Sequence, residues 1–87
     1  MLSDIVMSTR RAASAITSAQ NLRQRAIRAR RDASSLRIAA SHAPGFRSQR
    51  MTAEAATLEA RAEHWDRMAD RAMRQHAEAS ARLTFAA

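Results

Sequence analysis

Apolar residues recur along the chain at alternating intervals of three and four residues, in two long runs. The first run extends from Met1 to Ala43 and the second from Met51 to Ala86, and only Ser8 and His76 interrupt them. Such spacing places residues on one face of an α-helix. The pattern therefore predicts two long helices, each with a narrow apolar face that we call the seam. The seam positions are Met1, Ile5, Ser8, Ala12, Ala15, Ala19, Leu22, Ala26, Ala29, Ala33, Leu36, Ala40, Ala43, Met51, Ala55, Leu58, Ala62, Trp65, Ala69, Ala72, His76, Ala79, Leu83 and Ala86.

The two runs are separated by the only proline and the only glycine of the chain, Pro44 and Gly45. Proline lacks an N–H and disfavours helical backbone in the residue before it, and glycine readily adopts positive φ. We expect a helix over about residues 3–42, a turn over about residues 43–46 and a helix over about residues 47–85. A short linker between helices of equal length predicts an antiparallel hairpin that spans the whole chain, residues 1–87, as one all-α domain.

The composition supports the helical hairpin and indicates how its helices pack. Alanine accounts for 22 of the 87 residues, while one glycine and one proline are too few for the corners of a β or α/β fold. Alanine also fills 14 of the 24 seam positions, so we expect the two helices to approach closely. The larger seam residues form the predicted hairpin core, with Trp65 as its anchor or, alternatively, as a contact for a partner. The predicted core residues are Leu22, Leu36, Met51, Leu58, Trp65 and Leu83.

Charged residues flank the seams. Arg23, Arg30 and Arg37 repeat every seven residues beside the first seam, and an acidic stripe lies beside the second: Glu59, Glu63, Asp66 and Asp70. Folding at the Pro-Gly break brings together residues whose numbers sum to about 89. We therefore expect Arg23 to pair with Asp66 and Arg30 to pair with Glu59, as on the flank of an antiparallel coiled coil. The alternative is that the acidic stripe only faces solvent.

All isoleucines of the chain, Ile5, Ile16, Ile27 and Ile38, are eleven residues apart. Eleven residues are close to three helical turns, so the four side chains drift by only about 20° per step. Together with Leu2, this isoleucine stripe is the predicted partner or oligomer interface, because the hairpin partner covers only the seam. We expect either assembly of two hairpins into a four-helix bundle or docking on a helical protein partner. The alternative is that the stripe broadens the core of a single hairpin.

The chain has fifteen arginines, no lysine and a net charge of +7, and residues 1–43 hold eight arginines against two aspartates. An anionic partner, including nucleic acid, is therefore a second possibility. The candidate contacts are Arg23, Arg25, Arg28, Arg30 and Arg31. No aromatic residue lies among them to stack on bases, so a solvated basic face is the simpler interpretation.

No motif indicates catalysis, a cofactor or a metal site, and we expect a protein that is not an enzyme. His42, His64 and His76 lack the spacing of helical metal ligands, and the chain has no cysteine. His76 interrupts the second seam, where a packed histidine or a pH-sensitive interface is possible. The longest uncharged stretch, Ala12 to Leu22, is too short to span a bilayer.

No secretory signal is evident, so we expect a cytoplasmic protein, although export without a cleavable signal or an arginine-rich transit peptide stays open. The exclusive use of arginine as the basic residue is typical of a GC-rich genome and favours a bacterial or phage origin.

In length and predicted shape the chain resembles the Trp-X-Gly hairpins of type VII secretion, which implies a secreted hairpin with a heterologous partner. It departs from them because its turn is Ala43-Pro44-Gly45-Phe46, its tryptophan lies in the second helix, and it has no tyrosine. In architecture it is also similar to the small plasmid-type hairpins that dimerise into a four-helix bundle and bind RNA. A shared fold does not by itself carry a function.

These observations favour a non-enzymatic module that binds through helix packing, as an assembly subunit, adaptor, small chaperone or regulator. The first alternative is a nucleic-acid-binding hairpin dimer that uses the arginine-rich first helix. The second is a secreted hairpin of the type VII kind.

Overall fold

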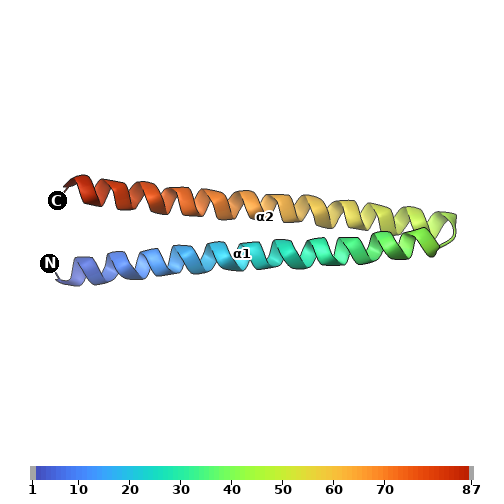
Figure 1. Cartoon of the computed structure of the whole chain (residues 1–87), viewed down its shortest axis with the longest axis horizontal. Coiled ribbons are helices and arrows are strands. Elements are labelled where there is room, and N and C mark those ends of the chain that lie inside the picture. Colours follow the sequence, from blue (N-terminus) through green and yellow to red (C-terminus); the bar gives the residue numbers. More distant parts are fainter. Residues whose placement is uncertain (1, 87) are drawn as a thin grey trace.

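The structure is a computed structural model that describes the backbone of residues 2–86 and the side chains of residues 6, 7 and 9–84. Helix α1 spans Leu2–His42 and helix α2 spans Gly45–Ala86. The helices run antiparallel, side by side, along their whole length (Figure 1). No strand occurs between residues 2 and 86. The predicted all-α helical hairpin is confirmed.

The turn is shorter than expected, because Gly45 and Phe46 already belong to α2. The N–H of Ala43 donates to the carbonyl of Ala40 at 3.3 Å and closes α1, and the N–H of Ser48 donates to the carbonyl of Pro44 at 3.2 Å. Pro44 thus directly precedes the first helical residue, where a missing N–H leaves no helical bond unmade. Gly45 does not adopt the positive φ that glycine permits, since helical backbone starts at this residue.

The core of the hairpin consists of alanine. Within the described side chains every buried residue is a seam alanine: Ala19, Ala26, Ala29, Ala33, Ala40, Ala55, Ala62 and Ala69. Ala62 packs against Ala26 and Ala29, and the half-buried Leu58 and Trp65 border this cluster. A second helix covers a seam from one side only, so a long side chain extends past it and stays partly exposed. Leu22, Leu36 and Met51 are likewise half-buried.

Leu83 departs from the predicted core, because 58% of its surface is exposed. The two helices diverge toward the chain termini (Figure 1). Between Ile5 and Leu22 the first seam holds only serine and alanine, and between Trp65 and Leu83 the second holds only alanine and His76. Without large side chains that interdigitate, nothing draws the helices together around Leu83.

The hairpin is a rod of 66 × 17 × 12 Å with a radius of gyration of 19.5 Å. A compact domain of this length has a radius of gyration of about 12 Å. The accessible surface is 6984 Å², whereas a compact monomer of this mass exposes about 5,100 Å². The rod therefore leaves about 1,900 Å² more surface in contact with water than a compact fold would.

Candidate interaction site

Three ion pairs join the helices along one flank. Arg23 donates to Asp70 at 2.8 Å and Arg30 donates to Asp66 at 2.6 Å. Arg37 binds Glu59 in a bidentate manner, from Nε to Oε1 at 2.6 Å and from Nη2 to Oε2 at 3.1 Å. We call these residues the ion-paired flank: Arg23, Arg30, Arg37, Glu59, Asp66 and Asp70.

The expected pairs Arg23–Asp66 and Arg30–Glu59 are wrong, although the two stripes do meet. The side chains of a helix lean toward its N-terminus. In an antiparallel hairpin a long arginine of α1 leans away from the turn, while an acid of α2 leans toward it. Arg30 lines the same surface depression as Glu59 but extends to Asp66. Each arginine therefore binds an acid that lies farther from the turn than the residue opposite it, where opposite residues have numbers that sum to about 89.

The pair nearest the turn also shifts protonation equilibria. Hydrogen bonding and charge attraction from Arg37 lower the pKa of Glu59 from its ordinary value of 4.5. The same pair raises the pKa of Arg37. A lowered carboxyl pKa stabilises the fold above the pH range where a free glutamate titrates, and this stabilisation is lost as the pH falls through the folded-state pKa. Because both groups face solvent, the effect is small.

The ion pairs divide the candidate anion-binding arginines. Arg23 and Arg30 are engaged with Asp70 and Asp66. Arg25, Arg28 and Arg31 are exposed and form no ion pair within the described residues. The cluster of five therefore provides three free guanidinium groups.

The isoleucine stripe does not keep a constant angle to α2. The buried alanines that face α2, such as Ala19, Ala26 and Ala33, recur every seven residues. The isoleucines recur every eleven, so each isoleucine is rotated about the axis of α1 by about 50° from the previous one, measured relative to this alanine seam. The exposed fraction accordingly rises from 38% at Ile16 and 40% at Ile27 to 66% at Ile38. The side chains of Leu2 and Ile5 lie outside the described residues.

Ile16 and Ile27 adjoin the ion-paired flank. Ile16 precedes Arg23 by seven residues, and Ile27 lies four residues after Arg23 and three before Arg30, so these positions share one side of α1. Both neighbouring arginines have acidic partners. The two isoleucines therefore adjoin two neutralised arginines, while Arg31, which lines a surface depression together with Ile27, forms no ion pair within the described residues.

A cleft lies between the diverging ends of the helices, with a cavity volume of about 750 Å³. Four seam alanines form its walls: Ala12, Ala15, Ala72 and Ala79. Arg11, His76 and Arg82 supply the charged or titratable groups, and no acidic side chain among residues 6, 7 and 9–84 lines it. The cleft thus combines small apolar side chains with two arginines.

The sequence interpretation missed this cleft. The signal that predicts it is the absence of a large seam residue between Ile5 and Leu22, facing a similar absence between Trp65 and Leu83. Elsewhere, leucine and tryptophan border the small residues and close the seam, as Leu58 and Trp65 do beside Ala62.

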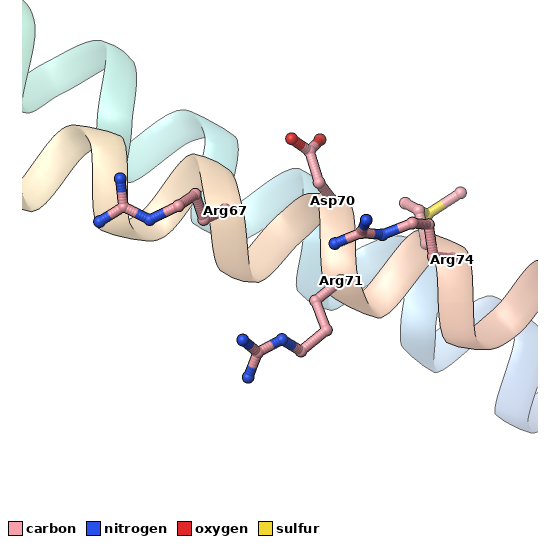
Figure 2. A pocket seen from close by; sticks show the side chains of 5 residues that line it. Arg67, Asp70, Arg71 and Arg74 are labelled. Atoms are coloured by element: carbon pink, nitrogen blue, oxygen red, sulfur yellow. The ribbon is translucent and has the colours of Figure 1, made fainter.

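A second surface depression, of about 500 Å³, belongs to α2 alone. Figure 2 shows that Arg67 and Arg71 extend in different directions from successive turns of the helix. Asp70 beside them is held by Arg23 of α1. Because the guanidinium groups do not converge, this depression does not form an anion-binding site.

Other chemistry is sparse in the described part of the chain. It contains no group of three side chains able to hold a metal ion. His42 and His64 are exposed, and only the half-buried His76 lines the cleft. Neither helix, over the residues searched, combines sufficient length with sufficient apolar character to cross a membrane.

Comparison of the chain with protein-family models, with curated proteins and with solved structures finds no match.

Proposed function

We propose that this protein is a non-enzymatic module that binds other helices by packing, as an assembly subunit or adaptor. One observation carries the proposal: among the described side chains the hairpin buries only alanine, whereas its large aliphatic and aromatic residues stay partly or largely exposed. The most exposed of the large residues are Val6, Met7, Ile16, Ile27, Ile38, Phe46, Met68 and Leu83.

The free energy of side-chain burial and the exposed surface area both support a partner that covers the hairpin. Burial of one alanine methyl contributes about 0.8 kcal/mol, whereas full burial of an isoleucine or leucine side chain contributes about 1.5–3 kcal/mol. The excess surface of about 1,900 Å² on one chain exceeds the roughly 800 Å² that each partner contributes to a standard protein–protein interface. A second helical pair is the simplest cover for such a rod.

A second copy of the chain suits the surface that contains Ile16 and Ile27. Arginines near this surface would repel their counterparts in another copy. Arg23 and Arg30 are neutralised by Asp70 and Asp66, and Arg31 beside Ile27 keeps its charge. Two hairpins packed through this surface form a four-helix bundle. The proposal includes a cytoplasmic location and a bacterial or phage origin, which rest on composition alone.

Sedimentation velocity tests this function. We expect the pure wild-type chain to self-associate, and the double variant Ile16→Arg with Ile27→Arg to sediment as a monomer or to lose helicity. The control is Ser14→Arg with Asn21→Arg, which adds the same charge at exposed positions on another side of the same helix and leaves the assembly intact. A fully helical wild-type monomer that sediments like the Ile16→Arg, Ile27→Arg variant would overturn self-association through this surface.

Nucleic-acid binding is the second candidate, and it rests on Arg25, Arg28 and Arg31. These arginines are free of ion pairs within the described residues and lie on the helix with the greater positive charge. Three contacts support weak binding that is indifferent to sequence and sensitive to salt.

A further inference from the structure

We propose that the cleft between the diverging ends of α1 and α2 binds an acidic amphipathic helix of a different protein. This inference rests on the proposed function, because it uses the same mode of binding. It concerns a separate surface, however, since neither Ile16 nor Ile27 lines the cleft.

The shape of the cleft suits large apolar side chains from a third helix. Four of its lining residues are alanines, whose side chains end at Cβ, and with Leu83 and several polar residues they enclose a volume of about 750 Å³ between two helices. Elsewhere in the hairpin leucine and tryptophan border such alanines. Here the leucine or isoleucine knobs of a partner helix take that position, in the manner of knobs-into-holes packing.

The charge of the cleft selects an acidic occupant. Arg11, His76 and Arg82 line it, and none of the aspartates or glutamates whose side chains the structure describes does. Glutamates on the flanks of a docked helix would meet both arginines, whereas lysines there would be repelled. Complementary charge at the edge of an apolar contact governs the choice of partner more than the affinity.

A second copy of this chain does not meet that requirement. Its exposed isoleucines lie on α1, where residues 1–43 contain eight arginines and two aspartates. On the flank of α2, Glu59, Asp66 and Asp70 already bind arginines of their own hairpin. No acidic residue lies three or four positions from Ile16, Ile27 or Ile38, so the exposed isoleucines of a second copy do not bring free acidic groups to the cleft.

The test uses two designed helical peptides of about three heptads each, with leucine along one face. One peptide carries glutamate on both flanks of that face, and its twin carries lysine. Fluorescence anisotropy of each labelled peptide is measured against the full chain at near-physiological salt. We expect the glutamate peptide to bind at least about tenfold more tightly than the lysine peptide.

Cleft-filling variants locate the binding site. Ala72→Leu with Ala79→Leu fills the cavity, and we expect it to weaken binding of the glutamate peptide by at least about tenfold. The control, Ala77→Leu with Ala81→Leu, makes the same changes at exposed positions of the same helix and leaves binding unchanged. Circular dichroism of each variant shows whether the hairpin is retained.

Charge reversal gives a readout that does not depend on filling the cavity. Arg11→Glu with Arg82→Glu should invert the preference, so that the lysine peptide binds more tightly. Arg10→Glu with Arg74→Glu changes the net charge equally at exposed arginines outside the cleft, and keeps the original preference.

Four results would overturn the inference. They are equal binding of both peptides, glutamate-peptide binding that ignores the cleft-filling variant, displacement of the peptide by duplex DNA at equal concentration, and a self-associated chain that dissociates in the cleft-filling variant. The second result still leaves helix binding at another surface. Loss of self-association in the Ile16→Arg, Ile27→Arg variant bears on the proposed function and leaves the peptide result unaffected.

Discussion

Gly45 occupies the first residue of α2, in helical backbone without positive φ. A Cβ added at this position meets no atom within 4 Å. Alanine in a compatible conformation restricts the unfolded chain, so we predict that Gly45→Ala raises the free energy of unfolding by about 0.4–1 kcal/mol. Urea unfolding followed by circular dichroism measures the change. Destabilisation would indicate that the turn uses positive φ at Gly45 in solution.

Arg30 and Asp66 form a half-exposed ion pair at 2.6 Å. We predict that Arg30→Asp and Asp66→Arg each destabilise the hairpin and that the double variant regains part of the loss, with a coupling energy of about 0.2–1 kcal/mol. The matched cycle pairs Arg23 with Asp66, which are not bonded, and should give a coupling near zero. If only the cycle of Arg23 with Asp66 showed coupling, the pairing predicted from the sequence would be correct and the one in the structure would be wrong.

At the scale of the helix, the closely packed alanines limit the size of side chain that a seam position of α2 can hold. Ala62 is fully buried against Ala26 and Ala29. We predict that Ala62→Leu forces the helices apart and lowers the free energy of unfolding by about 1–3 kcal/mol. Ala60→Leu, at an exposed position two residues away in the same helix, is the control and should change stability little. Equal effects of the two changes in urea unfolding would mean that the seam is loosely packed.

The two helices differ in how fully their charges are balanced. The acidic stripe of α2 holds three arginines through Glu59, Asp66 and Asp70. The rest of α1 keeps its positive charge free, and this charge governs any contact with an anionic partner.

For the whole molecule, the ion pairs set the salt dependence of any DNA binding. Three free arginines predict a log–log slope of about −2.7 on duplex DNA, whereas all five predict about −4.5. We expect the shallower slope from titrations with random duplex DNA between about 50 and 200 mM salt, in the range where counterion release dominates. The steeper slope would show that Arg23 and Arg30 leave their acidic partners to bind phosphate.

The sequence by itself determined two helices, one break and an antiparallel pair with an alanine seam. These features follow from local causes: the alternating three- and four-residue spacing of apolar positions, and a single Pro-Gly pair that stops one helix and starts the next. Even the individual buried residues, such as Ala26 and Ala62, are seam positions.

The tertiary structure decided which acid each arginine binds, and it showed how far the isoleucines turn from α2 and where the seam opens. Arg30 binds Asp66 because side chains have length and lean along the helix, which a count of residues about the turn does not contain. Ile38 faces away from α2 because the seam repeats every seven residues rather than every eleven. The cleft at Ala12 and Ala79 arises because both helices have small seam side chains at the same distance from the turn, so the space between them is not filled.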